Sequence, residues 1–287
     1  MEKIKYLIRK YGGEKVQDFI IWCLWFTKIN NKIILFSAKR AKHQRVNIHY
    51  WSGETNLGDS ISPIIVENIA RMRHVDIHRQ IEKTKHLYAV GSIITAGCQD
   101  CTIWGSGLLN TTHLARLARR KLDIRAVRGP LTRLVLMEHG FFVPEVYGDP
   151  AILMPLIYNP TVEKKYKVSV IPHMEEQKEY WNCNYHMINI RTDDYERIIN
   201  DIKASELVIS SSLHGIILAE AYGVPAILLK SRFSQFKYMD YYYGTNRFEY
   251  PIADSIQEAL EMTFPQVPDF AAMREALINA FPDDLWN

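Results

Sequence analysis

The stretch "SSSLHGIILAEAYGVP", residues 210–225, decides the fold, because within it a polar segment turns into an apolar one. It is bordered by "ELVISSS" and "VPAILLK", which both have the composition of buried strands. A strand, a helix and a second strand in this order predict a parallel pair joined by a right-handed crossover. His214 then lies at the carboxyl end of the first strand, where the helix begins.

The same alternation of short strands and helix-length segments continues along the rest of the chain. Further strands are expected at "VNIHYW", "HLYAVGS", "TIWGSG", "IRAVRG", "KVSVIPH" and "YHMINI". Helices are expected from Ser62 as N-cap before Pro63, from Pro130 to Gly140, and near 194–204, 215–222, 255–263 and 268–280. The pattern predicts an α/β fold of two facing Rossmann-like domains, residues 46–160 and 161–287, with "IYNPTVEKKY" as the linker.

The basic character of the chain belongs to residues 1–45. They contain eleven Lys or Arg against three Asp or Glu, a net charge of +8, whereas the remaining chain has 24 basic and 29 acidic residues. The apolar run from Phe19 to Phe26 is too short to span a bilayer, which needs about 20 residues. We interpret this segment as a basic, aromatic-rich helical extension that either packs on the fold or lies on an anionic membrane surface.

Composition and cysteine spacing exclude several classes of protein. With 47% hydrophobic and 23% charged residues the chain is globular, and no nucleic-acid-binding module accompanies the basic residues, so no nucleic acid is expected as a partner. Cys98 and Cys101 lack a second close pair or nearby histidines, so no metal site is expected. The expected location is cytoplasmic, with the extension on the inner face of the cell membrane as the peripheral alternative.

Two glycine-containing turns follow predicted strands, and ligands of open α/β sheets bind outside the carboxyl ends of the strands. In "SGETNLGDSIS", capping by Asp59 would explain one residue but not the polar cluster of Asn56, Gly58 and Asp59. The second turn offers backbone amides to an anion and consists of Gly105, Ser106 and Gly107.

Two more strand ends carry ionisable side chains. Arg128 comes immediately before a helix N-terminus and Thr132, and a guanidinium matches the geometry of phosphate or carboxylate. His214 follows three serines, and its strand-end position favours a functional role over a structural one. The neighbours expected to share its site are Ser212, Leu213 and Gly215.

Taken in order, these motifs resemble the polysaccharide pyruvyl transferase family. The resemblance runs from about residue 46 to 230 and rests on Asn56-x-Gly58-Asp59, "GSII", "WGSGLL", "VRGPLT", "GDPAIL", "VIPH" and "SSSLHGIILAEAYGVPAILL". It implies two facing halves similar to a GT-B glycosyltransferase. It also implies phosphoenolpyruvate as donor substrate, no separate cofactor, and a bacterial surface polysaccharide or its lipid-linked precursor as acceptor.

The resemblance also implies roles for particular residues. Leu213 and His214 match a pair that contacts phosphoenolpyruvate, and Arg128 is the best match for a contacting arginine, with Arg125 as a substitute. Many members have Arg-Asp where this chain has Arg128-Gly129, so any role of that acidic residue is absent or moved. His173 matches a recurring histidine that we place near the cleft.

The expected reaction forms a ketal, and several roles in it stay open. Arg128 is expected to hold the phosphate with help from Ser212 or Thr132, and His214 is either the acid or a cationic phosphate ligand. Asp59 or Asp149 would accept the proton of an attacking hydroxyl, unless each only caps a helix.

Two other functions compete with this interpretation. A GT-B glycosyltransferase that uses a nucleotide sugar would need Glu220, six residues after His214, as its ribose contact. A non-catalytic, membrane-docked polysaccharide-binding protein would explain the basic extension only. The segment "FSQFKYMDYYYGTNRF" is expected to be a loop whose aromatic rings mostly pack, with one or two at the cleft.

Overall fold

The structure is a computed structural model that describes residues 13, 16, 42–51, 54–97, 99–118 and 120–287. The apolar run at 19–26 and Cys98 lie outside the described residues, so the proposed membrane element stays a prediction. Within the described part, no helix has both the length and the apolar character needed to cross a bilayer.

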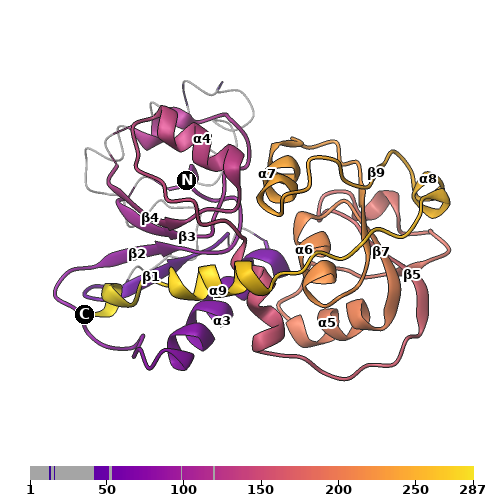
Figure 1. Ribbon diagram of the computed structural model, residues 1–287, viewed down its shortest axis with the longest axis horizontal. Helices are drawn as coiled ribbons and strands as arrows, with labels where there is room; N and C mark the ends of the chain where they lie inside the picture. Colours follow the sequence, from indigo (N-terminus) through magenta and orange to yellow (C-terminus); the bar gives the residue numbers. More distant parts are fainter. Residues whose placement is uncertain (1–12, 14–15, 17–41, 52–53, 98, 119) are drawn as a thin grey trace.

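The N-terminal sheet contains four parallel strands in the order β1-β2-β3-β4. The strands are β1 (Val46–His49), β2 (Lys85–Tyr88), β3 (Cys101–Trp104) and β4 (Leu122–Ala126). The helical elements of this half are α3 (Leu57–Met72), η3 (Leu114–Leu117), α4 (Pro130–Glu138) and η4 (Pro150–Leu156). Figure 1 shows this half beside the part of the chain that holds the second sheet.

The second sheet contains five parallel strands in the order β6-β5-β7-β8-β9. The strands are β5 (Tyr166–Ile171), β6 (His186–Met187), β7 (Ser205–Ser210), β8 (Ala226–Leu229) and β9 (Ile252–Ala253). The helices are η5 (Gln177–Glu179), α5 (Tyr195–Lys203), α6 (Leu213–Ala221), α7 (Phe236–Gly244) and α8 (Ile256–Glu261). The α/β class with parallel sheets, predicted from the alternation of strands and helices, is confirmed.

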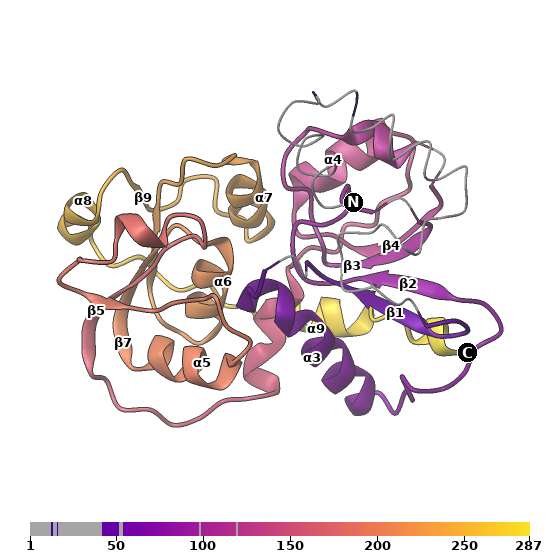
Figure 2. The ribbon, with the colours of Figure 1, turned by 180° about the vertical axis from the view of Figure 1, so that it is seen from behind.

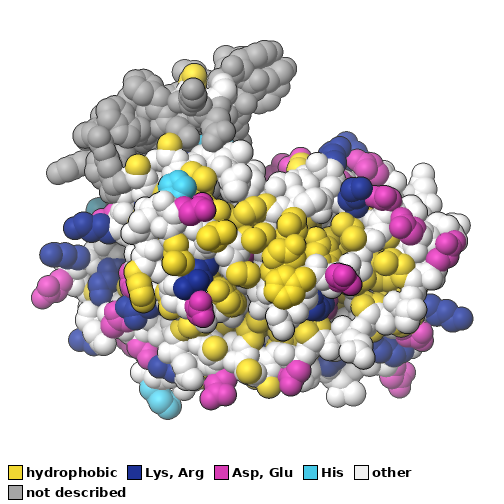
Figure 3. Space-filling model, turned by 45° about the horizontal axis from the view of Figure 1, so that its top comes forward, with side chains coloured by type: hydrophobic (Ala, Val, Ile, Leu, Met, Phe, Trp, Pro, Cys, Tyr) yellow, Lys and Arg dark blue, Asp and Glu magenta, His cyan; other side chains and the backbone are white. Residues whose placement is uncertain are grey.

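The helix α6, which contains His214, is buried on all sides. Of its residues from Leu213 to Ala221, only His214 is not fully buried, and a helix that is apolar all round belongs in a core. It packs against β7 and β8 of its own sheet and against η4 of the N-terminal half. One apolar cluster therefore contains residues from both halves, and Figure 3 shows hydrophobic side chains across the middle of one face, over both halves.

The end of the chain returns to the N-terminal half. The helix α9 (Ala271–Asn279) lies beside α3 in both ribbon views, and the turn η6 (Asp283–Trp286) follows it (Figures 1 and 2). The indole Nε1 of Trp104 in β3 donates to the Leu277 carbonyl at 2.8 Å. The domain boundaries 46–160 and 161–287 stay a prediction. The helix α9, which they assign to the C-terminal domain, contacts the N-terminal half through Leu277.

Two helix expectations were wrong. The first long helix begins at Leu57 after Asn56 as N-cap, so Pro63 lies inside it, and the hydroxyl of Ser62 instead accepts a hydrogen bond from the Val90 amide. The segment expected to be a loop forms α7, because the rings of Tyr238, Tyr241 and Tyr242 are buried. Tertiary burial outweighed the weak local pattern in both cases.

A buried ion pair holds α6 to the segment that follows α7. The guanidinium of Arg247 contacts both carboxylate oxygens of Glu220, at 2.6 and 2.7 Å, and the Tyr241 hydroxyl donates to the same carboxylate at 2.6 Å. The side chain of Glu220 is 1% exposed. Because a buried carboxylate is costly without its partner, this pair constrains the packing of α6.

We expect Arg247→Met to lower the free energy of unfolding by about 3–5 kcal/mol, because it leaves the Glu220 carboxylate buried and unpaired. Urea unfolding followed by circular dichroism measures the loss. The matched control is Arg71→Met, which breaks an exposed pair with Glu67 and should leave the unfolding midpoint nearly unchanged. Equal losses in the two variants would contradict this account.

Candidate functional site

A pocket of about 570 Å³ lies where strands of both sheets end. We call it the strand-end pocket, because its lining follows β1, β2, β3, β5, β6, β7 and β8 in the chain. Its lining residues are Trp51, Glu54, Asn56, Asp59, Ser92, Ile93, Ala96, Leu109, Asn110, His173, Met174, Glu175, Ile190, Ser212, Leu213, His214, Phe233, Ser234 and Lys237. This is the edge at which parallel α/β sheets present ligands.

The pocket separates the residues singled out from the sequence into two groups. Those that line it are Asn56, Asp59, His173, Ser212, Leu213 and His214. Those that do not are Gly58, Gly105, Ser106, Gly107, Arg128, Thr132, Asp149 and Gly215. Of the second group, Gly58 and Asp149 lie against His214, and the contacts of the others are described below.

The imidazole of His214 lies against the first turn of α3. A Cβ atom at Gly58 would come within 1.9 Å of Nδ1, so only glycine leaves room for the ring at this position. The side chain of His214 is 15% exposed, and its Nε2 is buried without a hydrogen-bond partner in the described structure. Gly58 therefore positions the histidine, which is a role that differs from the substrate contact expected from the sequence.

Asp149 lies behind His214. One of its carboxylate oxygens caps η4 by accepting from the Ala151 amide at 3.0 Å. The other, Oδ2, is buried and lies 3.7 Å from Nε2 of His214, beyond hydrogen-bond distance. The expected direct contact of Asp149 with a substrate does not fit, because its side chain is fully buried outside the pocket lining.

Asp59 is the pocket's buried carboxyl group. It lies in the first turn of α3, three residues after the N-cap Asn56, whose side-chain amide donates to it at 2.6 Å. Burial raises the pKa of Asp59, while the nearby charges of His214 and Lys237 oppose this increase. A carboxyl group with a raised pKa beside a histidine is suited to exchanging protons.

The expected contact between Arg128 and a bound anion does not fit the structure. Its guanidinium is fully buried and donates from Nε to Asp240 at 3.1 Å and from Nη2 to the Leu108 carbonyl at 2.6 Å. Its Nη1 donates at 2.5 Å to the hydroxyl of Ser92, which does line the pocket. Arg128 thus contacts the pocket lining only at Ser92, among the contacts named, and its other guanidinium nitrogens donate to Asp240 and Leu108.

The turn of Gly105, Ser106 and Gly107 also serves packing. A Cβ atom at Gly107 would lie 2.4 Å from Cζ of Arg128, so this glycine makes room for the guanidinium. The Ser106 hydroxyl donates to the Gly91 carbonyl at 2.7 Å. Two further predicted contacts are also internal, since the Thr132 hydroxyl donates to Asp240 and Gly215 lies against Ser210.

Lys237 is the cation that sequence reasoning missed. It is the second residue of α7 and 7% exposed, and its Nζ lies 4.9 Å from the Tyr238 ring centroid. Among the described residues, none accepts a hydrogen bond from this Nζ. Burial and the charge of Arg128 lower the pKa of Lys237 to about 8, so it is mostly protonated at neutral pH. A buried ammonium without an acceptor in a pocket wall is an anion-binding group.

His173 lines the same wall as a neutral ring. Burial, followed by the charge of Lys237, lowers the pKa of His173 to about 4. Its Nδ1 accepts from the Glu175 amide at 3.3 Å, so Nε2 carries the proton. The ring packs at 4.5 Å against that of Phe233, which also lines the pocket. His173, expected near the cleft, and Phe233, from the aromatic 233–248 segment, both line the pocket, and their contact with a substrate stays a prediction.

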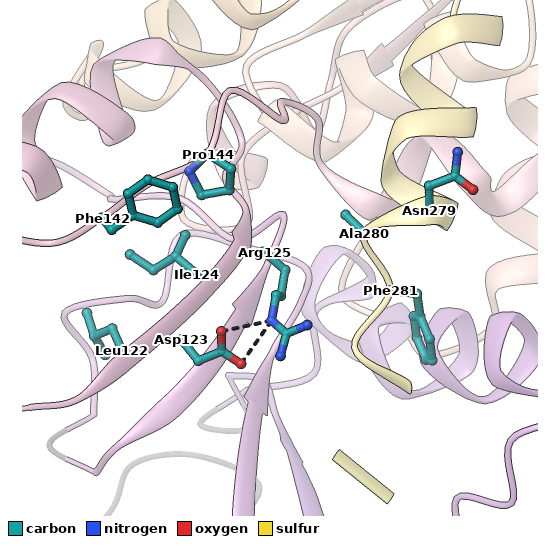
Figure 4. A pocket seen from close by; sticks show the side chains of 9 residues that line it. All are labelled: Leu122, Asp123, Ile124, Arg125, Phe142, Pro144, Asn279, Ala280 and Phe281. Atoms are coloured by element: carbon teal, nitrogen blue, oxygen red, sulfur yellow. Dashed lines mark hydrogen bonds and ion pairs between the residues drawn. The ribbon is translucent and has the colours of Figure 1, made fainter. Parts of the chain in front are cut away.

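Two residues tied to alternative interpretations lie elsewhere. Arg125 borders a separate hollow that shares no residue with the strand-end pocket, and Figure 4 shows its guanidinium directed at Asp123. It also donates to Asp284, so both partners are carboxylates. Glu220, the ribose contact that a nucleotide-sugar glycosyltransferase would need, is instead buried with Arg247. The position of Arg125 therefore does not support a substrate contact, and that of Glu220 does not support a contact with the ribose of a nucleotide sugar.

Lys237 was missed because it lies eight residues beyond the end of β8. Ser92 comes four residues after the end of β2, and the rule that ligands bind at strand ends would have found it. A lysine inside an aromatic segment carries no such signal, because its position depends on where α7 packs.

Comparisons with known proteins find a matching family model and similar chains. Residues 87–231, just over half of the chain, match the family model described as polysaccharide pyruvyl transferase. The chain is 32% identical over 209 residues to the succinoglycan biosynthesis protein ExoV of Rhizobium meliloti (strain 1021), covering 67% of this chain and 63% of that protein. It is 28% identical over 193 residues to an uncharacterized protein of Acanthamoeba polyphaga mimivirus, covering 63% and 66%. The alignments thus span less than two thirds of either relative.

We expect the strand-end pocket to bind sulfate, and its affinity to fall about tenfold as the pH rises through about 8. The ammonium of Lys237 is charged below its pKa and neutral above it, whereas sulfate remains a dianion throughout. Isothermal titration calorimetry from about pH 6 to about pH 10 measures the change.

The variant Lys237→Met should bind sulfate weakly at every pH, and the control Lys230→Met should behave like the unmodified protein, because Lys230 is exposed and pairs with Asp254. An affinity that does not change with pH, or that survives Lys237→Met, would show that Lys237 does not bind the anion.

Proposed function

The chain belongs to the polysaccharide pyruvyl transferase family, and we propose that it transfers pyruvate from phosphoenolpyruvate to two hydroxyls of one sugar, as a ketal. The acceptor proposed is a glycan of a bacterial surface polysaccharide or its lipid-linked precursor. We further infer that the two parallel sheets are the cores of two Rossmann-like domains in a GT-B-like arrangement.

The buried ammonium of Lys237 carries the proposal. Phosphoenolpyruvate has a phosphate and a carboxylate, and its binding in the pocket requires a positive charge that is not already neutralised. Lys237 supplies such a charge in the same pocket as His214 and Asp59. A non-catalytic polysaccharide-binding protein has no need for this cation, because neutral sugars bind through hydrogen bonds and apolar contacts.

The reaction requires one proton to be added and two to be removed. Carbon 3 of phosphoenolpyruvate takes a proton, which leaves a cation at carbon 2 that the first hydroxyl attacks. Phosphate then leaves and the second hydroxyl adds to the same carbon. One hydroxyl proton replaces the proton delivered to carbon 3, and the other leaves with the phosphate. The products are the ketal, with a new methyl group, and hydrogen phosphate.

Three residues are assigned to these steps. His214 is the acid that protonates carbon 3, and the Asp149 carboxylate lies 3.7 Å from its Nε2. Asp59 accepts the hydroxyl proton, and Lys237 binds the phosphate. Arg128 acts through the Ser92 hydroxyl, which it holds at 2.5 Å.

The test is incubation of the protein with phosphoenolpyruvate and a candidate glycan, with measurement of free phosphate and detection of the ketal methyl group by NMR. Acceptor-dependent phosphate release with ketal in the product supports the proposal. Release of a nucleotide from a sugar donor, without phosphate release from phosphoenolpyruvate, would overturn it.

We expect His214→Gln to lower kcat by about a hundredfold or more, because it removes the acid, and to leave the Kd for phosphoenolpyruvate nearly unchanged. Steady-state kinetics and calorimetry measure the two constants. His139→Gln is the matched control, because His139 lies at the end of α4, outside the pocket. A large increase in Kd with kcat retained would instead identify His214 as a phosphate ligand.

A further inference from the structure

A second hollow shares a wall with the strand-end pocket. It measures about 550 Å³, and Met174 and Glu175 line both. We call it the Trp181 hollow, and its other lining residues are Gln177, Lys178, Trp181, Asn189, Arg191 and Arg232. A ligand that extends out of the first pocket past Met174 and Glu175 would enter it.

The hollow exposes an indole ring. Trp181 is 66% exposed, whereas Trp104 and Trp286 are fully buried in the core. A large aromatic side chain exposed in the wall of a hollow can provide a binding surface for a ligand there. Its flat apolar face suits the C–H face of a sugar ring.

Beside the indole lie amide groups that are held in place. The Oδ1 of Asn189 accepts from the Gln177 side-chain amide at 2.6 Å and from the Arg191 backbone amide at 2.8 Å. In the part of the chain that the structure describes, the Asn189 Nδ2 and the Gln177 Oε1 have no partner. One donor and one acceptor remain, which matches sugar hydroxyls that both donate and accept.

The two arginines of the hollow do not make it an anion site. Arg191 donates from Nε and Nη2 to the Met174 carbonyl and pairs through Nη1 with Glu54 at 3.0 Å. Arg232 pairs with Glu179 at 3.2 Å and donates to the Glu175 carbonyl. A phosphate would have to displace these protein acceptors, whereas a neutral sugar leaves them in place.

Building on the proposed function, we propose that the Trp181 hollow binds a second sugar of the acceptor, stacked on the indole. The enzyme's acceptor is then an oligosaccharide of at least two sugars. The sugar that receives pyruvate lies in the strand-end pocket, and its neighbour passes Met174 and Glu175 into the hollow.

Calorimetric titration with methyl glycosides of glucose and galactose, and with the matching β-linked di- and tetrasaccharides, tests this proposal. We expect the best disaccharide to bind the full-length protein about tenfold more tightly than its monosaccharide. Trp181→Ala should remove this advantage without weakening the binding of the monosaccharide or of phosphoenolpyruvate, and Trp181→Phe should keep most of it.

The control Phe264→Ala removes an aromatic side chain that is 53% exposed and lines neither pocket, and it should retain the full advantage. The assignment is wrong if no oligosaccharide binds more tightly than its monosaccharide, or if the advantage survives Trp181→Ala. It is also wrong if inorganic pyrophosphate competes with the second sugar. A length advantage without phosphate release from phosphoenolpyruvate would overturn the proposed function and leave the sugar site standing.

Discussion

The buried ion pair between Arg128 and Asp240 is the contact on which the rest of the site depends. Arg128 follows β4 in the N-terminal half and Asp240 lies in α7 of the other half, with 2.9 Å between their charged groups. Lys237 precedes Asp240 by three residues and therefore lies on the same side of α7. Fixing Asp240 thus fixes the direction of the Lys237 ammonium. Because both charges of the pair are fully buried, loss of either one leaves the other without compensation.

Small residues make this contact geometrically feasible. A Cβ atom at Gly129 would lie 1.8 Å from the Asp240 carbonyl oxygen, and one at Gly107 would overlap the guanidinium of Arg128. A Cβ atom at Gly58 would likewise overlap the His214 ring. Gly107 belongs to the turn after β3 whose backbone amides were expected to face an anion. The groups that approach these glycines belong to the protein: side chains at Gly107 and Gly58, and a backbone carbonyl at Gly129.

The strand-end pocket contains both a basic group, Lys237, and an acidic group, Asp59, which do not form an ion pair with each other in the described structure. Among the described residues, none accepts a hydrogen bond from the ammonium of Lys237, while the carboxyl of Asp59 has a raised pKa because it is buried. His173 stays neutral in the same wall, because burial and Lys237 both disfavour its charged form. Such a site offers the ammonium of Lys237 to an anionic ligand and places groups that can exchange protons next to it. The neighbouring Trp181 hollow, with its free amide groups, provides a surface of a different kind.

Sequence alone determined the alternation of strands and helices, the parallel sheets and the strand-end positions of Asn56, Asp59, His173 and His214, because these depend on local hydrophobic periodicity. The sequence could not determine that the Arg128 guanidinium is buried and paired with Asp240, because an arginine before a helix can be either buried or exposed. It also could not place Lys237, because α7 forms only when Tyr238, Tyr241 and Tyr242 are buried against other elements. Tertiary structure decided which charges neutralise each other and which one remains for a ligand, because that depends on distances between segments over a hundred residues apart.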